Sequence, residues 1–251
     1  RSTRKESSAA SDVYKRQTLA DGGKVLIPIP AVGRAQEIMM VIDHYMKSGE
    51  MVEAPVFTEG MISEASAIHE SYPEYLAREL KQKILETDDN PFDSEYFTNI
   101  EHADAREEPM RENSPCIILA TSGMLEGGPV LEYFNNIAPD SKNKVVFVSY
   151  QVNGSLGRRV LDGSKQVSML GKEGKVEIVS VNCGVEKLDG FSGHSDYNQL
   201  MSFVQRLRPK LRRVLVNHGE RSKSENLAMN IRRTYKLPAH YPQVQEAIKL
   251  F

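Results

Sequence analysis

The 251-residue sequence contains no tryptophan, only two cysteines and no long hydrophobic run. Cys116 and Cys183 lie in apolar stretches without Cys-x-x-Cys spacing. This pattern excludes a disulfide framework and a cysteine-based zinc site, and it predicts two buried free thiols. No apolar stretch approaches the roughly 20 residues of a membrane helix, and no hydrophobic signal segment follows the amino terminus. We therefore expect a cytoplasmic protein with no membrane partner.

Charge is unevenly distributed, although the formal net charge is only -2. Residues 18–187 carry 16 Lys and Arg against 27 Asp and Glu, whereas residues 188–251 carry 11 against 5. Within the basic part, the stretch RLRPKLRR (206–213) holds five cations in eight positions. This density of cations is enough to attract a phosphate backbone, although a solvated helix end has a similar composition.

The first 17 residues differ from the rest of the chain. They lack apolar periodicity and are rich in serine and charge, a composition that predicts disorder. They also look like a translated sequencing adapter, so we expect residues 1–17 to be disordered or artefactual. The folded part is then expected to start near Thr18.

From Thr18 onward, short strands and helices alternate. Apolar and β-branched runs predict strands at residues 24–29, 55–58, 116–120, 144–150, 175–182 and 213–217. Apolar residues at helical spacing predict helices at residues 33–49, 63–85, 129–135, 196–207 and 224–235. The acidic section 87–114 interrupts this alternation and is expected to be a surface excursion. The order of elements predicts an α/β fold with a layered, mainly parallel sheet.

Three loops after predicted strands combine glycine with groups that bind phosphate. Open α/β sheets place ligand sites beyond the carboxyl ends of their strands. The three loops are PAVGRAQE with Arg34 at a helix start, ATSGMLEGGP with Ser122, Gly123 and nearby backbone N–H groups, and YQVNGSLGRRV with Arg158 and Arg159. An ordinary turn explains each loop taken singly. Three such loops on one predicted edge favour a phosphate-binding surface.

Two histidines lie in short glycine-containing loops. His194, in DGFSGHSDYNQL, precedes a predicted helix whose first turn Ser195 or Asp196 can cap. His218, in VLVNHGE, follows a predicted strand. A strand-helix-strand unit returns the chain to the same sheet edge, so we expect both imidazoles to reach one pocket. That arrangement suits a metal ligand paired with an acid or base.

Other interpretations of the histidines remain open. A capping turn whose imidazole faces water is the alternative for His194. The three histidines on predicted helices or in the acidic section are expected to be packed or exposed without a catalytic role; they are His44, His69 and His102.

The ordered motifs resemble the β-CASP branch of the metallo-β-lactamase superfamily, which contains nucleases with a zinc-dependent active site. FSGHSD followed by VNHGE, with PAVGRAQE and ATSGMLEGGP upstream, carries the resemblance from about Gly22 to the carboxyl end. EASAIHESYPEYL, NPF and CIILATSGMLEGGPVLEYF look like the archaeal homologues of the nuclease subunit of the cleavage and polyadenylation specificity factor. The resemblance implies a β-CASP domain at residues 18–187. Residues 188–251 would be the returning carboxyl-terminal part of a metallo-β-lactamase αββα domain.

The resemblance also implies roles for single residues. His218 matches the family histidine that ligates zinc, and His194 matches the histidine that protonates the leaving oxygen or stabilises its charge. Two zinc ions in the intact parent would activate a water and hold phosphate oxygens. Contacts with single-stranded RNA are expected from Arg34, Ser122, Gly123, Arg158 and Arg159.

Part of the family's active site is absent from the sequence. The His-x-His-x-Asp-His motif and the upstream histidine and aspartate ligands of zinc are missing. Pro30 and Asn217 stand where apolar residues are usual in the family, a difference expected to affect strand ends rather than catalytic groups. We expect at most the carboxyl half of an active site, so this chain alone should bind zinc poorly and cut no RNA.

The sequence thus predicts a fragment of a zinc-dependent endoribonuclease that acts on single-stranded RNA in 3′-end processing, transcription termination or decay. The sequence leaves open whether 5′-to-3′ exonuclease activity accompanies the endonuclease activity. The alternative is a non-catalytic RNA-binding scaffold subunit of a processing complex, because several family members have lost their metal ligands; a DNA-processing relative is a third interpretation. We expect the intact parent to form a homodimer, partly through residues 239–251, and to contact the transcription machinery.

Overall fold

The computed structural model describes residues 16–249, except residues 88, 112–113, 172–173, 189 and 192–193. Residues 1–17 are predicted to be disordered or artefactual. Of these, residues 1–15 lie outside the described residues. A short helix, α2 (Arg16–Ala20), begins two residues before the expected start of the fold. The chain forms two compact units, one ending at Phe191 and the other comprising the residues after it.

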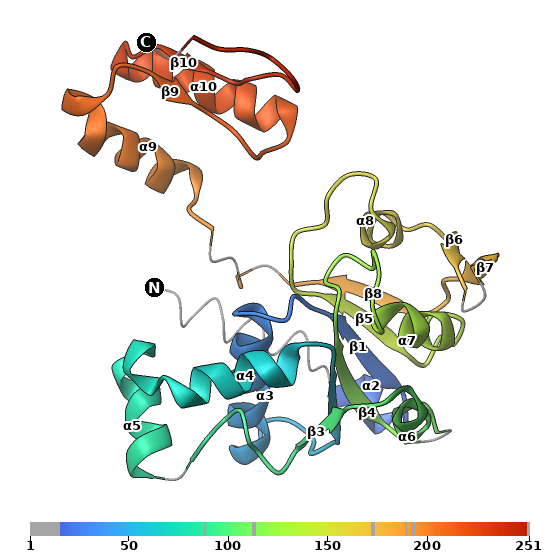
Figure 1. Cartoon of the computed structure of the whole chain (residues 1–251). Coiled ribbons are helices and arrows are strands. Elements are labelled where there is room, and N and C mark those ends of the chain that lie inside the picture. Colours follow the sequence, from blue (N-terminus) through green and yellow to red (C-terminus); the bar gives the residue numbers. More distant parts are fainter. Residues whose placement is uncertain are drawn as a thin grey trace. The chain divides into compact units, whose positions relative to one another are not determined.

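The first unit is built on a six-stranded parallel sheet (Figure 1). In order of pairing, its strands are β3 (Phe97–Ile100), β2 (Val56–Glu59), β4 (Cys116–Ala120), β1 (Lys24–Pro28), β5 (Lys144–Phe147) and β8 (Gly184–Lys187). β1 and β4 are buried along their whole length, which explains their uninterrupted apolar runs. The predicted α/β fold with a parallel sheet is confirmed.

Helices and a hairpin cover both faces of this sheet. They are α3 (Arg34–Lys47), α4 (Ile62–Ser71), α7 (Val130–Ile137), α8 (Leu156–Leu161), β6 (Gln166–Leu170) and β7 (Val176–Ser180). α3 and α4 share one apolar core with Ile27, whereas α7, α8 and the hairpin share a second core with Leu26. Successive side chains of a strand point to opposite faces, so these neighbouring residues of β1 belong to different cores.

Several elements of the first unit differ from the prediction. The predicted helix 63–85 is interrupted, because α4 ends at Ser71 and α5 (Arg78–Glu86) starts after a 3₁₀ turn, η1 (Pro73–Tyr75). Proline cannot continue a helix from within, and here it opens a new turn. The section 87–114 is more than an excursion, since it contains β3, η2 (Ala103–Arg106) and α6 (Glu107–Met110). The predicted strand 175–182 is not in the parallel sheet; β7 pairs antiparallel with β6.

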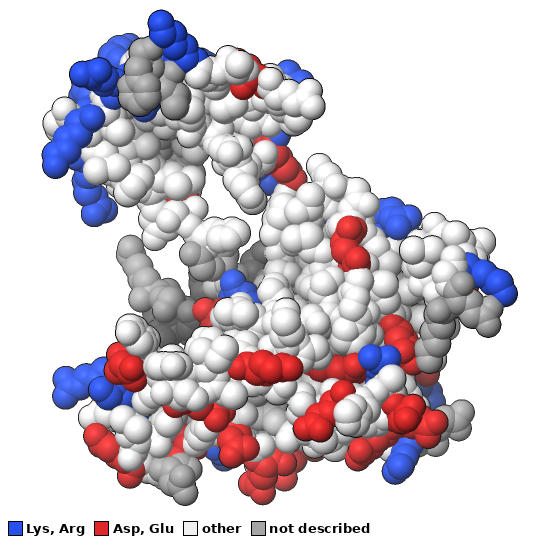
Figure 2. Space-filling model, viewed as in Figure 1, with Lys and Arg blue, Asp and Glu red and all other residues white. Residues whose placement is uncertain are grey.

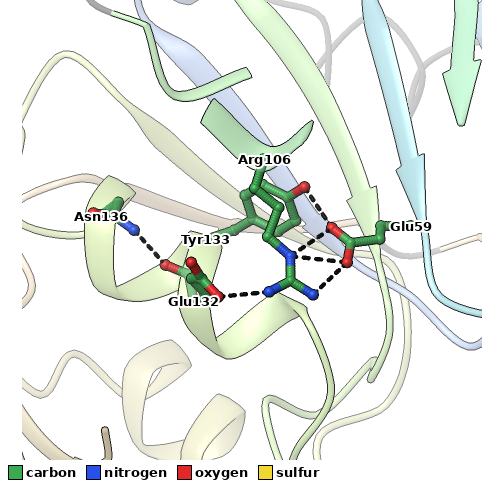
Figure 3. A network of polar contacts seen from close by, with 5 residues as sticks. All are labelled: Glu59, Arg106, Glu132, Tyr133 and Asn136. Carbon is green, nitrogen blue, oxygen red and sulfur yellow. Dashed lines mark hydrogen bonds and ion pairs between the residues drawn. The ribbon is translucent and has the colours of Figure 1, made fainter. Parts of the chain in front are cut away.

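A partly buried polar network lies at the end of β2 (Figure 3). The Glu59 carboxylate, at the end of β2, accepts hydrogen bonds from the Arg106 guanidinium at 2.6 to 3.0 Å and from the Tyr133 hydroxyl at 2.5 Å. Arg106 also pairs with Glu132 at 2.6 Å. The hydrogen bond to Glu59 raises the pKa of Arg106, and burial followed by the same carboxylate raises the pKa of Tyr133. The network joins β2, η2 and the first turn of α7.

The second unit is small. Its elements are α9 (Tyr197–Leu207), η3 (Arg208–Lys210), β9 (Val214–Leu215), α10 (Arg221–Tyr235) and β10 (Ala239–His240). Among the described strands, β9 pairs only with β10, so the expected return of the strand before His218 to the earlier sheet stays a prediction. No described helix has both the length and the apolar composition needed to cross a membrane.

The apolar face of α9 is largely uncovered. The spacing of Leu200, Phe203, Val204 and Leu207 predicts one packed face, but of these four only Val204 is buried. Met201 is the other buried residue of α9, and both contribute to the small core of the second unit. The helix therefore packs through a narrower stripe than its sequence indicates.

Candidate nucleic-acid interface

Four loops diverge at the carboxyl edge of the parallel sheet. The chain leaves β1 and β2 toward α3 and α4 on one face, and it leaves β4 and β5 toward α7 and α8 on the other. Because β4 lies between β2 and β1, and β1 lies between β4 and β5, neighbouring strands send their loops in opposite directions. Open α/β sheets form ligand-binding crevices at the points where neighbouring loops leave in opposite directions.

The loops after β1, β4 and β5 are in direct contact. A Cβ atom on Gly123 would lie 2.8 Å from Pro30 Cδ and 3.0 Å from Ser149 Oγ, so only glycine fits between the two neighbouring loops. The buried Gln151 donates from Nε2 to the carbonyl oxygens of Gly123 at 2.9 Å and Ser149 at 3.1 Å. The three glycine-containing loops meet at one edge, as the sequence predicts. Pro30 lies beyond the end of β1 and packs within this junction.

Arg34 is held by the protein at the start of α3. Its guanidinium pairs with the Glu37 carboxylate and lies over the Phe191 ring, 5.9 Å from the ring centroid. The side chain is only 15% exposed. A phosphate at Arg34 would have to compete with Glu37, a restriction that the sequence pattern did not reveal.

Ser122 and its neighbours close their own turn. The Ser122 N–H donates to the Gly127 carbonyl oxygen at 3.2 Å, and the Ser122 hydroxyl accepts from the Glu126 N–H at 3.1 Å. The Ser122 N–H, which the sequence pattern indicated to be exposed for an anion, is therefore engaged within the loop, as is the Glu126 N–H.

The two arginines of α8 have different partners. Ser155 caps the helix by accepting from the Arg158 N–H at 3.1 Å. The Arg158 guanidinium pairs with Asp162 at 2.8 Å, and its side chain is 35% exposed. Arg159 is exposed and makes a long contact of 3.5 Å with the Ser168 carbonyl oxygen of β6. Both guanidinium groups thus reach solvent near the carboxyl edge.

His218 lines an open pocket of about 620 Å³ in the second unit. The pocket is bordered by the start of α9, by residues 216–219 and by the first turns of α10. His218 has a left-handed backbone with a φ of 67°, and its N–H donates to the Asn217 side-chain oxygen at 2.8 Å. Asn217, which departs from the family pattern, therefore supports the backbone conformation of the histidine beyond the end of β9.

His194 is exposed and precedes α9. Of the two predicted caps, Asp196 is the one used. Its side chain accepts from the Gln199 N–H at 2.8 Å, while the Gln199 side chain accepts from the Asp196 N–H at 2.9 Å. His194 is not among the described residues that line the pocket of His218, so the expected convergence of the two imidazoles on one pocket is not seen.

The part of the chain that the structure describes does not contain a complete zinc site. No group of three or more His, Cys, Asp or Glu side chains lies close enough together there to hold a metal ion. Catalytic zinc takes three protein ligands, and His218 supplies at most one. The donor set therefore does not fit the metal unless further ligands come from outside the described residues.

The three histidines expected to have no catalytic role and the two thiols agree with that expectation. His44 and His102 are exposed, and His69 contacts the Ala65 carbonyl oxygen at 2.6 Å, in agreement with the predicted ordinary packing or exposure. Cys116 and Cys183 are free and buried, as predicted. Burial raises the pKa of each thiol to about 11, which suppresses the nucleophilic thiolate.

The two units differ in the sign of their surface charge. The visible surface of the first unit carries many acidic side chains, whereas Lys and Arg predominate on the second unit (Figure 2). The five cations of RLRPKLRR are all exposed around η3; they are Arg206, Arg208, Lys210, Arg212 and Arg213. An exposed cluster of this kind attracts polyanions such as nucleic acids.

Two family models match the chain in succession. The Beta-Casp domain matches residues 35–160, and the Zn-dependent metallo-hydrolase RNA specificity domain matches residues 178–242. The first match covers half of the chain and includes strands β2, β3, β4 and β5 of the parallel sheet, and the second covers both histidine loops.

Named archaeal relatives cover almost the whole chain. Transcription termination factor FttA of Cenarchaeum symbiosum is 77% identical over 249 residues, which are 99% of this chain and 39% of that protein. The proteins of the same name from Pyrococcus abyssi and Methanocaldococcus jannaschii are 47% and 44% identical over 93% of this chain, which is 36% and 37% of their lengths. The chain thus spans less than two fifths of these relatives. It belongs to the β-CASP family, in the archaeal group related to the nuclease subunit of the cleavage and polyadenylation specificity factor.

Proposed function

We propose that this chain is the β-CASP and RNA-specificity portion of a zinc-dependent endoribonuclease that acts on single-stranded RNA in transcription termination, 3′-end processing or decay. The observation that carries the proposal is the match of residues 178–242 to the RNA specificity domain, with its exposed cations around η3. The relatives named transcription termination factor support an assignment to termination. The same proposal includes 5′-to-3′ exonuclease activity in addition to the endonuclease activity.

The two histidines have separate roles in this proposal. His218 offers one imidazole nitrogen to zinc, while His194, as an imidazolium, offsets negative charge on the departing ribose oxygen. Zinc would supply an activated water at neutral pH. The remaining metal ligands must come from outside the described residues, so cleavage belongs to a longer protein that contains this chain.

Single substitutions in such a longer protein separate these roles. His218→Ala should lower both zinc content and RNA cleavage, because it removes a ligand. His194→Ala should keep the zinc and lose turnover. Metal analysis and a cleavage assay on purified variants measure the difference. Equal loss of zinc in both variants, or full activity in His194→Ala, would contradict the assignment.

RNA binding is proposed to involve the carboxyl edge, where Arg158 and Arg159 reach solvent. Replacing both with alanine should weaken binding and make the salt dependence shallower, by about 0.7 in the logarithmic slope for each phosphate that is no longer neutralised. Arg78→Ala with Lys81→Ala on α5 removes the same charge away from the three loops and serves as the control. An unchanged affinity and salt slope for the variant that lacks Arg158 and Arg159 would exclude these arginines from the RNA-binding surface.

A non-catalytic RNA-binding scaffold is the second candidate. It is favoured by the lack of a metal-binding cluster within the described residues. The longer protein decides between the candidates: a scaffold would bind RNA and leave it uncut in the presence of zinc, whereas the nuclease would cut it.

A further inference from the structure

An aromatic ring accompanies the arginines at the carboxyl edge of the first unit. Tyr150 lies three residues beyond the end of β5 and is 43% exposed. Its flanking residues are fixed, because the Ser149 hydroxyl donates to the Gly123 carbonyl oxygen at 3.3 Å and the buried Gln151 holds Gly123 and Ser149 from the other side. The loop therefore presents the ring of Tyr150 from a backbone that is packed against the β4–α7 loop.

Exposed apolar side chains occur in the same loop and in two other loops that follow strands of this sheet. Val32 follows β1, Met61 precedes α4, and Val152 lies two residues after Tyr150; all three are exposed. Apolar surface grouped at a ligand-binding edge is typical of an interaction site. α8, which carries Arg158 and Arg159, begins four residues after Val152. Aromatic, apolar and cationic groups thus follow one another along the segment between β5 and α8.

We propose that Tyr150 is a stacking platform for a nucleobase of a single-stranded nucleic acid bound along the carboxyl edge. The inference rests on the proposed RNA-binding function and adds a named base contact to it. An aromatic ring that is followed along the same segment by two arginines fits this ligand, since the ring stacks on a base while the cations bind phosphates. An apolar peptide would use the ring but not the two arginines, so nucleic acid is the favoured occupant.

The size of the effect follows from the chemistry of stacking. Truncating an aromatic platform weakens binding of single-stranded nucleic acid by roughly 5- to 150-fold per stacked base. The weakening depends on the base, because a strand without bases has no surface to stack. It leaves the phosphate contacts of Arg158 and Arg159 in place.

The test uses this 251-residue chain and two fluorescently labelled strands of equal length, an oligoadenylate and an abasic phosphate strand. Tyr150→Leu removes the ring and keeps an apolar side chain, whereas Tyr150→Phe keeps the ring. Tyr75→Leu is the matched control, because Tyr75 lies in η1 and is 84% exposed. Fluorescence anisotropy gives the dissociation constants, and thermal unfolding shows that each variant is folded.

The expected pattern separates stacking from phosphate binding. Tyr150→Leu should bind oligoadenylate roughly 5- to 150-fold more weakly and the abasic strand as tightly as the unchanged chain does. Tyr150→Phe and Tyr75→Leu should match the unchanged chain on both strands. Because the sequence contains no tryptophan, Tyr150→Trp also provides a single tryptophan, whose emission oligoadenylate should quench and the abasic strand should not.

The other outcomes would overturn the proposal in distinct ways. Unchanged binding of oligoadenylate by Tyr150→Leu, or equal binding of the two strands by the unchanged chain, would refute the stacking role and leave phosphate binding intact. Capture of an apolar peptide by the unchanged chain but not by Tyr150→Leu, without any effect of the oligonucleotides, would assign the ring to a protein partner. Failure of the unchanged chain to bind either strand would remove the proposed RNA binding itself.

Discussion

At the scale of single residues, the Glu59 carboxylate depends on Arg106 for compensation of its charge. Glu59 is buried and accepts three hydrogen bonds from that guanidinium. Removing one partner of a buried ion pair leaves an uncompensated charge, which costs about 3–5 kcal/mol. We expect Arg106→Leu to lower the free energy of unfolding by that amount, as measured by urea unfolding.

An exposed ion pair provides the control for this prediction. Arg158→Leu breaks the pair with Asp162 on α8, and exposed pairs contribute under about 1 kcal/mol. The triple variant Glu59→Leu, Arg106→Leu, Tyr133→Phe should recover most of the loss, because no carboxylate at position 59 and no hydroxyl at position 133 is then buried without a partner. If Arg106→Leu destabilised the chain no more than Arg158→Leu does, the network in Figure 3 would not hold the sheet as we infer.

The buried thiols predict a dependence of stability on pH. The pKa of Cys116 and of Cys183 is raised to about 11 in the folded chain, against about 8.5 for an unperturbed thiol. Between these values the unfolded thiols lose protons that the folded thiols keep, so stability falls as pH rises. The expected decline is about 1.4 kcal/mol per pH unit for each thiol. The free energy of unfolding, measured from about pH 7 to 10, tests this decline. An equally steep decline in the double variant Cys116→Ala, Cys183→Ala would show that the thiols are not its cause.

At the scale of elements, the sequence predicted those with a strong apolar signal. The buried runs of β1 and β4 and the amphipathic pattern of α3 match the structure closely. β3 was missed because only Ile100 of its four residues is buried, so an edge strand in an acidic section has no apolar period. β10 is two residues long and depends on pairing with β9, a tertiary contact that no local pattern reveals.

The capping box of α9 gives a prediction for that helix. Asp196→Ala removes the acceptor of the Gln199 N–H and should cost about 1 kcal/mol, whereas Asp196→Asn should keep most of the cap. Hydrogen exchange at the amide of Gln199 reports the change, since that group would lose its partner. The same exchange rate in the alanine variant as in the unchanged chain would mean that the box does not stabilise the helix.

At the scale of the whole molecule, sequence reasoning located the candidate interface better than its chemistry. The alternation of strands and helices and the positions of glycines were enough to predict three loops on one edge. The contact of Arg34 with Phe191 was not predictable, because Phe191 lies far away in the sequence and approaches only through the fold. The pairing of β9 with β10 was likewise not predictable, because it joins two short segments on either side of α10.

Self-association of the longer protein is a further prediction. The segment after α10 contains β10 and then continues without a helix to residue 249, and Val244 within it is 94% exposed. We expect a homodimer that uses residues 239–251 in part. Light scattering at micromolar concentration should give twice the monomer mass, and Val244→Lys should lower it. A monomeric mass for the unchanged protein would refute the prediction.

The two units should unfold separately, because their cores differ in size. Nineteen and 21 buried residues form the two described cores of the first unit, but seven form that of the second. A unit of about 60 residues is marginally stable, and the exposed Leu200 and Phe203 on α9 add no burial here. We expect the amides of α10 to exchange at a lower free energy than those of β4. Ile231→Ala, at a cost of about 2–5 kcal/mol, should unfold the second unit and leave the sheet protected, whereas Ile118→Ala should weaken the sheet. Equal exchange free energies in α10 and β4, lowered together by Ile231→Ala, would show one cooperative molecule instead of two units.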